Sequence, residues 1–279
     1  MKIREILPLW RVERFLARQR ARKALPITKE MLKYNLLAAQ RHGVEPACHP
    51  RDFIYDYVIK HLSGTQTAVD YYFDDGARSA EKFADIVSKL AIHRQPIDVL
   101  EFASGYGCVT RHLKKNAALS LVACDIHKEA TDFIQTKLGV PSRLSAHVPE
   151  EFSLEEKFDV VFALSFFSHM PKSTFGRWIK ALFSQLRCPG YLIFTTHGLA
   201  SLERSGNPEI PSDGIWFSEI SEQGDLKITE YGTSIVTEDF VTRQVYEQTG
   251  EAIFDYQHAA WWDHQDLWIV KNTLDRARH

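Results

Sequence analysis

Short, almost entirely apolar runs alternate with helical segments between Pro96 and Gly198, and this alternation constrains the fold more than any other feature. The runs are rich in β-branched and aromatic residues, and helix-like segments separate them. Strands that are apolar on both faces and separated by helices are typical of a parallel sheet that helices cover on both sides. The expected strands are 97–103, 119–125, 142–147, 158–165 and 190–198, and the expected helices between them are 107–116, 127–138 and 171–187.

The residues before this alternating region indicate helices. A first helix is expected between Thr28, a good N-terminal cap, and Gly43, a good stop. A second ends at Gly64, and a third begins after Gly76. We therefore expect a helical N-terminal extension over residues 1–95.

The residues after Gly198 predict a different arrangement. Residues 199–236 are expected to form a lid insertion with a hairpin around Gln223–Asp225. A helix capped by Thr237 and stopped by Gly250 follows, and two closing strands are expected at 251–259 and 266–272. The second predicted domain is thus 96–279.

Composition excludes several classes of function. Among 279 residues, 44% are apolar and the net charge is −2, so there is no electrostatic case for a nucleic-acid partner. The four cysteines show no paired spacing and are expected to be reduced, as in a cytoplasmic protein. Residues 1–23 carry eight Lys or Arg. This segment is expected either to pack on the domain or to make a peripheral contact with the inner membrane surface.

The stretch "VLEFASGYGCVTRHL", Val99–Leu113, places two glycines directly after the first strand. A glycine-rich turn between a strand and a helix lets the backbone approach a ligand closely. Asp125 follows Gly105 by 20 residues and ends the second strand, where a carboxylate can accept both hydroxyls of a ribose. Together these features predict a site for an adenosine-containing cofactor.

A nicotinamide dinucleotide is the first alternative, and two residues argue against it. The dinucleotide motif GxGxxG requires a third glycine, and the sequence has Thr110 there. Glu101, at the end of the first strand, would lie unfavourably beside a pyrophosphate but suits a cofactor with an ammonium group or a cationic sulfur.

With these residues, the sequence resembles the class I S-adenosylmethionine-dependent methyltransferases over about residues 96–272. "VLEFASGYG" is similar to their first motif, and "LVACDI" to the one that contains the ribose-binding acid. "FDVVFALSFFSHMP" resembles the fourth-strand motif, and "LFSQLRCPGYLIFTTHG" the element that leads into the fifth strand. The resemblance implies a Rossmann-like, seven-stranded, mostly parallel sheet with an antiparallel C-terminal hairpin. It also implies S-adenosylmethionine as cofactor and S-adenosylhomocysteine as product.

The resemblance also implies which residues hold the cofactor. Two departures are visible: Ala103 stands where the family usually has glycine, and the third strand lacks the usual Asp or Asn, so that Ser145, Ala146 or His147 would contact the adenine. The segment "YYFDDGARSAEKFADI" resembles one that folds over the methionine end of the cofactor in some members. The implied cofactor residues are Tyr72, Arg78, Glu101, Ala103, Gly105, Gly107, Asp125, Ile126, His147, Ala163 and Leu164.

Methyl transfer to a hydroxyl needs a base, and three histidines are candidates. His169 follows the fourth strand, His197 ends the fifth, and His264 lies in the turn between the closing strands. Each has a structural alternative: His169 shapes the cofactor pocket, His197 caps its strand, and His264 fixes its turn. Asp263, Asp266 and His197 could form a metal site, but their spacing is unspecific and no metal is predicted.

The acceptor is expected to be a small molecule or a saccharide-like compound, methylated on a hydroxyl oxygen. The candidate acceptor contacts are Trp216, Tyr231, Trp261 and Trp262. "EYGTSIVTEDF" and "DHQDLWIV" resemble stretches of bacterial methyltransferases that act on glycans or lipid-linked sugars. A catalytically inactive cofactor-binding partner and an NAD(P)-dependent oxidoreductase remain alternatives, and the oligomeric state stays open.

Overall fold

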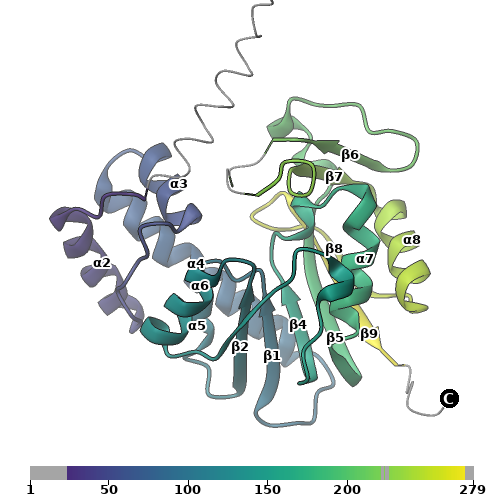
Figure 1. The fold of residues 1–279 in the computed structure, drawn as a ribbon, viewed down its shortest axis with the longest axis horizontal. Coiled ribbons are helices and arrows are strands. Elements are labelled where there is room, and N and C mark those ends of the chain that lie inside the picture. The colour runs from purple at the N-terminus through teal and green to yellow at the C-terminus, as the bar shows by residue number, and fades with distance from the viewer. Residues whose placement is uncertain (1–23, 221–222, 224–225, 274–279) are drawn as a thin grey trace, which may run out of the picture.

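A computed structural model describes residues 24–220, 223 and 226–273, so the basic segment 1–23 lies outside the described residues. Its centre is a seven-stranded sheet in the order β3-β2-β1-β4-β5-β9-β8 (Figure 1). The strands are β1 Ile97–Phe102, β2 Leu119–Asp125, β3 Ser142–Leu144, β4 Phe158–Ala163, β5 Leu186–His197, β8 Ile253–Trp261 and β9 Gln265–Asn272. In this sheet, β9 runs antiparallel to both of its neighbours, β5 and β8, and the other pairings are parallel. The predicted doubly wound sheet with an antiparallel C-terminal hairpin is confirmed.

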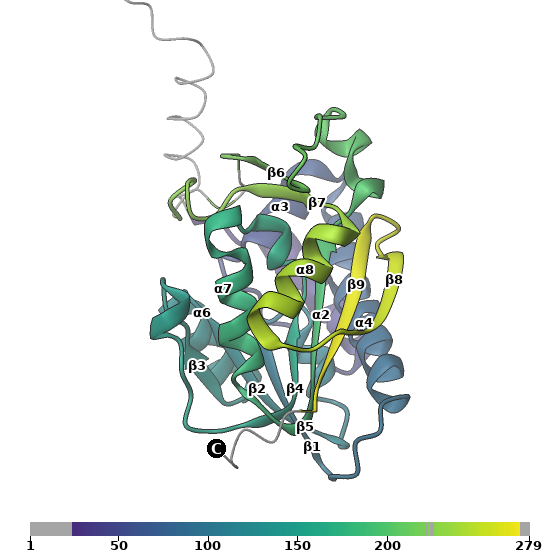
Figure 2. The same ribbon diagram turned by 90° about the vertical axis from the view of Figure 1, so that its right-hand side faces the viewer.

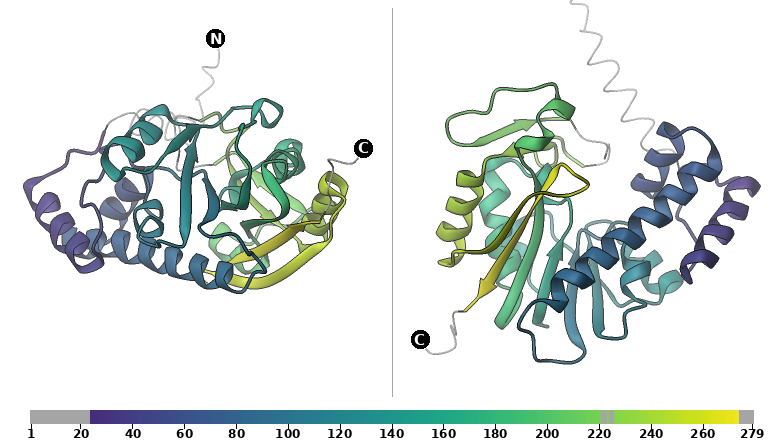
Figure 3. Two further views of the ribbon diagram at one scale, coloured as in Figure 1. Left: turned by 90° about the horizontal axis from the view of Figure 1, so that it is seen from below. Right: turned by 180° about the vertical axis from the view of Figure 1, so that it is seen from behind.

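Helices cover both faces of the sheet (Figure 3). On one face, α4 (Thr65–Ser88), α5 (Thr110–Leu113) and α6 (Lys128–Phe133) pack on the strands, and Phe83 meets Phe162 at 4.5 Å between ring centroids. On the other face lie α7 (Lys172–Phe183) and α8 (Glu238–Thr249). Because apolar side chains project from both faces of β4, this strand is buried along its whole length, as parallel central strands require.

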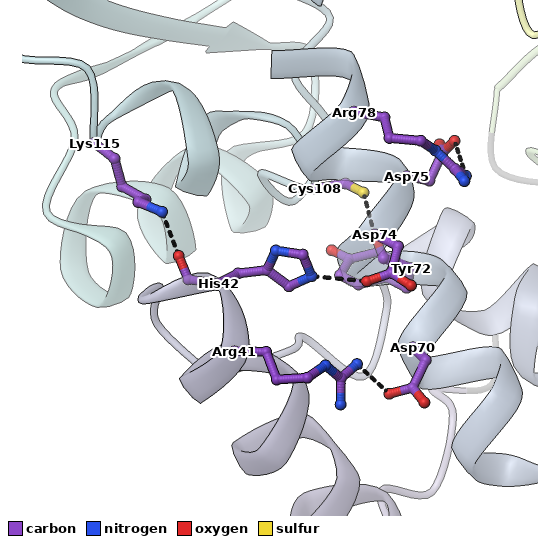
Figure 4. A network of polar contacts seen from close by, with 9 residues as sticks. All are labelled: Arg41, His42, Asp70, Tyr72, Asp74, Asp75, Arg78, Cys108 and Lys115. Atoms are coloured by element: carbon purple, nitrogen blue, oxygen red, sulfur yellow. Dashed lines mark hydrogen bonds and ion pairs between the residues drawn. The ribbon is translucent and has the colours of Figure 1, made fainter. Parts of the chain in front are cut away.

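The N-terminal helices form a smaller apolar cluster on the first half of α4. They are α2 (Lys29–His42) and α3 (Phe53–His61). The Thr28 side chain accepts a hydrogen bond from the backbone of Met31 at 3.1 Å, and Gly43 ends α2 in the left-handed conformation, as predicted. Polar pairs join α2 to α4 along its length, including Arg41–Asp70 and His42–Asp74, both at 2.7 Å (Figure 4).

Helix α4 corrects the expectation that a helix begins only after Gly76. The helix runs without interruption from residue 65 to 88, and Gly76 lies in its middle. An added Cβ at Gly76 would lie 2.3 Å from the backbone oxygen of Cys108, which follows the glycine turn. The glycine therefore serves close helix packing and does not interrupt the helix.

Other element boundaries differ from the sequence expectation. The helix expected at 107–116 is the single turn α5, and the one expected at 127–138 is α6 followed by the π-helix η1 (Ile134–Leu138). The predicted hairpin pairs β6 (Ile215–Ser218) with β7 (Thr233–Val236), so its connection is longer than expected. Ile235 and Val236 of β7 are both buried and pair with Trp216 and Ile215 of β6.

The hairpin β6–β7 and the N-terminal helices lie on opposite sides of the carboxyl edge of the sheet (Figures 1 and 2). We use "carboxyl edge" for the edge where β1, β2, β4, β5 and β8 end and β9 begins. In the described part of the chain, no helix has the length and apolar character needed to cross a membrane.

We expect Gly76→Ala to lower the free energy of unfolding by about 1–3 kcal/mol, because the added methyl group meets backbone. The measurement is chemical denaturation of the variant and the wild type.

Gly176→Ala in α7 is the matched control. Its Cβ would meet the flexible end of Gln244 at 2.2 Å, which can move aside, and alanine favours the helix. This variant should be as stable as the wild type or more stable. Equal stability of the two variants would contradict the packing role of Gly76.

Candidate functional site

The glycine turn after β1 adopts left-handed backbone conformations at three positions. Ala103, Gly105 and Gly107 have φ of 57°, 55° and 81°. A Cβ at Gly105 would meet nothing within 4 Å, so the space beside it is open to a ligand. A Cβ at Gly107 would lie 2.4 Å from the side chain of Leu138, which gives that glycine a packing role.

Asp125 connects the end of β2 to this turn. Its Oδ2 accepts a hydrogen bond from the backbone of Gly105 at 2.8 Å, and its Oδ1 accepts one from the backbone of His127 at 2.9 Å. Nδ1 of the His127 ring also lies 2.9 Å from Oδ1, so the buried carboxylate has three contacts for about four acceptor positions, and the open position is at Oδ2. The carboxylate is therefore held in place with acceptor capacity left for a ligand.

Glu101 lies at the end of β1 with its carboxyl group in the protein interior. Only 4% of the residue is exposed, and Oε2 has no hydrogen-bond partner among the described residues. Burial raises the pKa of Glu101 to about 8, and Asp125 contributes in the same direction. A hydrogen bond with Thr110 opposes the shift but leaves Oε2 unpaired, and a buried, unpaired carboxyl oxygen favours a ligand cation beside it.

The other implied cofactor residues lie along the same edge. Ala163 ends β4 and is buried, and Leu164 follows it. Ile126 follows Asp125 directly and is half-buried. The chain after β3 returns to β2 where Ser145 donates to the backbone oxygen of Asp125 at 2.8 Å, and His147 lies two residues farther on.

Tyr72 and Arg78 are placed differently from each other on α4. The hydroxyl of Tyr72 donates to Asp52 at 2.6 Å inside the N-terminal cluster, so Tyr72 is a core residue. Arg78 is exposed and pairs with Asp75 on the side of α4 away from α2 (Figure 4). The neighbouring Tyr71, 43% exposed, lies on the Arg78 side of the helix, because the guanidinium of Arg78 is 5.9 Å from its ring centroid.

The N-terminal region also contacts the glycine turn, which the sequence did not indicate. Arg111 donates from Nε to the backbone oxygen of Gly107 at 3.1 Å and from Nη1 to that of Glu45 at 2.8 Å. His49, in the same loop, stacks on Tyr106 with 4.5 Å between ring centroids. Tyr106 stands between the two glycines, so this loop borders the turn.

The three candidate histidines lie together at the carboxyl edge. The ring centroids of His169 and His197 are 6.3 Å apart, and those of His197 and His264 are 5.7 Å apart. His169 belongs to the short 3-10 helix η3 (Phe167–His169), which follows β4. The cluster therefore joins residues from β4, β5 and the β8–β9 turn, and we call these three residues the histidine cluster.

Hydrogen bonds orient the two outer imidazoles. Nδ1 of His169 is 2.7 Å from the backbone oxygen of Gly232, and Nδ1 of His264 is 2.7 Å from that of Trp262. A carbonyl oxygen only accepts, so Nδ1 carries the proton in each ring; this assignment rests on the hydrogen-bond network. In the neutral rings, Nε2 then has the lone pair that a base needs.

His197 has a different environment. Burial and, after it, the neighbouring His169 and His264 lower the pKa of His197 to about 3, while a hydrogen bond with the backbone of Ser234 opposes this shift. Its Nδ1 is buried and has no hydrogen-bond partner among the described residues. The ring is therefore neutral at physiological pH.

The candidate acceptor contacts divide into two groups. Tyr231 stacks on His169 at 4.5 Å, and Trp262 stacks near His264 at 6.3 Å and donates from Nε1 to Asp75 at 2.7 Å. Trp216 is half-buried in β6. Trp261 is only 2% exposed, and its Nε1 donates to Ser79 at 3.3 Å, which makes it a core residue. Within the described ranges, no group of three His, Cys, Asp or Glu residues could hold a metal ion.

We expect Glu101→Gln to stabilise the ligand-free protein increasingly as pH rises. The folded-state pKa of Glu101, about 8, lies above its usual value, so folding favours the protonated form. The contribution of Glu101 to the free energy of unfolding is fully present below the usual pKa of a glutamate. It is lost as the pH rises from that value towards 8, at roughly 1.4 kcal/mol per pH unit. Glutamine does not ionise and avoids that loss.

The measurement is the free energy of unfolding of both proteins between pH 5 and pH 9, and the difference should grow with pH and level off above 8. Glu81→Gln, at an exposed position of α4, is the control and should show no such trend. A constant difference for Glu101→Gln would contradict the raised pKa.

Known proteins with similar sequence and structure agree with this architecture. A family model described as "Methyltransferase domain" matches residues 76–217, half of the chain. Malonyl-[acyl-carrier protein] O-methyltransferase of Calditerrivibrio nitroreducens is 31% identical over 127 residues, which are 45% of this chain and 48% of that protein. The match thus spans about half the length of this relative.

Two solved structures have the same fold. An S-adenosylmethionine-dependent methyltransferase from Clostridium acetobutylicum superposes with a TM-score of 0.52 and 15% identity, over 78% of this chain and 97% of that one. The glycopeptide N-methyltransferase MtfA in complex with S-adenosyl-L-methionine gives a TM-score of 0.51 and 13% identity, over 70% and 93% of the two chains. The chain belongs to the methyltransferase-domain family and has the class I, Rossmann-like methyltransferase fold.

Proposed function

We propose that this chain transfers the methyl group of S-adenosylmethionine to a hydroxyl oxygen of a small-molecule or saccharide-like acceptor. The observation that carries the proposal is the position of the histidine cluster. Three imidazoles, two of them with hydrogen bonds that place a proton on Nδ1, lie at the same sheet edge as the open glycine turn and its two buried carboxyl groups.

The residues of the turn fit this cofactor. The unpaired Oε2 of Glu101 suits the ammonium group of its methionine part, and Asp125 has acceptor capacity at Oδ2 for a ribose hydroxyl. Gly105 leaves space for the ligand to approach the backbone. A pyrophosphate would face two carboxyl groups instead, which disfavours a dinucleotide. When bound, the cofactor supplies a methyl group that is already electrophilic.

The residues at the carboxyl edge then orient the acceptor and receive its proton. A hydroxyl group must lose a proton when its oxygen gains a methyl group, and a neutral imidazole anchored through Nδ1 can receive it at Nε2. His169 and His264 have this arrangement. His197 is a weak base because its pKa is about 3, so its role is to accept a hydrogen bond from the acceptor.

The same cluster disfavours a carboxylate as the acceptor. A carboxylate carries no proton and would face the lone pairs of the imidazoles. A compound with several hydroxyl groups, such as a saccharide, can donate to more than one imidazole.

We expect Asp125→Ala to weaken binding of S-adenosylhomocysteine by on the order of 1–3 kcal/mol, the cost of leaving ribose hydroxyls unpaired. Calorimetric titration measures the affinity. Asp132→Ala, at an exposed position of α6 where the carboxylate pairs with Lys128, should bind as the wild type does. S-adenosylhomocysteine should raise the melting temperature of the wild type, whereas NAD and NADP should not. Unchanged affinity in Asp125→Ala would exclude the ribose assignment.

We expect at least one of His169→Ala and His264→Ala to lower kcat by about 100-fold or more, the usual contribution of a general base. The assay follows transfer of labelled methyl groups to fractions of a small-molecule extract, and then to the acceptor purified from the active fraction. Affinity for S-adenosylhomocysteine should stay within twofold of wild type. If both variants retain full turnover, the histidine cluster does not provide the base; if no fraction accepts a methyl group, the proposed reaction itself fails.

A further inference from the structure

Ser165, the second residue after β4, has a backbone conformation that only glycine adopts easily. Its φ is +57°, although the residue has a Cβ. Such a conformation costs on the order of 1 kcal/mol or more and persists only where the surroundings enforce it. Residues of this kind concentrate at functional sites, and Ser165 lies at the carboxyl edge between the glycine turn and the histidine cluster.

A closed ring of hydrogen bonds enforces this conformation. The backbone of Ser165 donates to Oγ1 of Thr195 at 2.8 Å, and Oγ1 of Thr195 donates to Oε1 of Gln265 at 2.7 Å. Nε2 of Gln265 then donates to Oγ of Ser165 at 2.9 Å, which closes the ring. Thr195 and Gln265 are 0% and 2% exposed, so water does not compete for these bonds.

A second loop of bonds connects Ser165 to η3. Oγ of Ser168 donates to the backbone oxygen of Ser165 at 2.6 Å, and the two hydroxyl oxygens are 3.0 Å apart. Because Ser168 uses its proton on the carbonyl group, the proton between the hydroxyls comes from Ser165. Each hydroxyl and amide in the network thus has a definite donor or acceptor role.

Each partner of Ser165 stands next to one member of the histidine cluster. Ser168 directly precedes His169, and Gln265 directly follows His264. Thr195 lies two residues before His197 on the same strand, so both side chains point to the same face of the sheet. The network therefore joins the three chain segments that carry the histidines, and Ser165 is the member bonded to Thr195, Gln265 and Ser168.

We propose that Ser165 is a positioning residue for methyl transfer: through Thr195, Gln265 and Ser168 it fixes the separation and orientation of the three imidazoles. This inference rests on the proposed role of the histidine cluster at the acceptor site. It assigns no contact with the methyl group to Ser165 itself.

The test compares Ser165→Gly with Ser165→Ala. Both remove the hydroxyl group, but glycine tolerates the positive φ whereas alanine keeps the backbone strain. Nitrogen-15 NMR of histidine-labelled protein reports the tautomer and the environment of each imidazole without any acceptor. We expect the signals of His169 or His264 to move towards those of a tautomer mixture in both variants, while affinity for S-adenosylhomocysteine stays within twofold.

With the identified acceptor, kcat should fall at least tenfold in both variants, and the KM for S-adenosylmethionine should not change. Variants that are folded and show wild-type histidine signals would overturn the proposal, even if their melting temperatures were lower. Loss of activity in Ser165→Ala but not in Ser165→Gly would also overturn the proposal, because backbone strain at residue 165 would then account for the loss. Failure of the wild type to bind the cofactor would instead overturn the proposed function. The NMR comparison would still show whether Ser165 orients the imidazoles, because it needs neither cofactor nor acceptor.

Discussion

The bond between Asp125 and the backbone of Gly105 is the interaction on which the geometry of the carboxyl edge depends. It joins the end of β2 to the turn after β1, so that the open backbone of the turn and two buried carboxyl groups face the same region. Parallel strands bring their carboxyl ends to one edge. This bond and those that Ser104 donates to the backbone oxygen of Cys124 hold the turn above that edge. Burial of Glu101 at the end of β1 raises its pKa to about 8, and the nearby Asp125 adds to that shift.

The acceptor side of the edge is assembled from segments far apart in the chain. The hairpin β6–β7 reaches it through Gly232, whose backbone nitrogen donates to the oxygen of His169 at 3.0 Å and whose oxygen meets the ring of the same histidine. Ser234 adds a bond from its hydroxyl to the backbone of Phe167 at 3.1 Å. The hairpin is therefore fastened directly to the residues that form the histidine cluster.

The sequence indicated the sheet, most strands and several helix ends because these depend on local patterns. Thr28 and Thr237 cap their helices through bonds within three residues, and apolar strands follow from burial on both faces. Which side of α4 faces the site could not be predicted in this way. Because the helix was expected to begin after Gly76, the sequence did not indicate which of Tyr71 and Tyr72 points inward. The orientation of the helix about its axis depends on the close packing of Gly76 against the backbone oxygen of Cys108, which is distant in the sequence.

The same distinction between local patterns and tertiary contacts applies to the candidate site. The meeting of the three histidines follows from the rule that parallel strands end at one edge, and the sequence indicated it. The choice between Trp261 and Trp262 did not follow, because adjacent residues alternate in direction but the pattern does not say which one points inward. The ring around Ser165 has no sequence signature, since serine, threonine and glutamine occur in many surroundings and only tertiary contacts bring them together.

The uninterrupted course of α4 has a mechanical consequence. The first half of this helix packs against α2 and α3, and its second half packs on the sheet. Near its middle, Asp75 accepts a hydrogen bond from Trp262 and so holds the β8–β9 turn. Because an α-helix without a break transmits displacement along its axis, the helical extension cannot swing away from the sheet as a separate body.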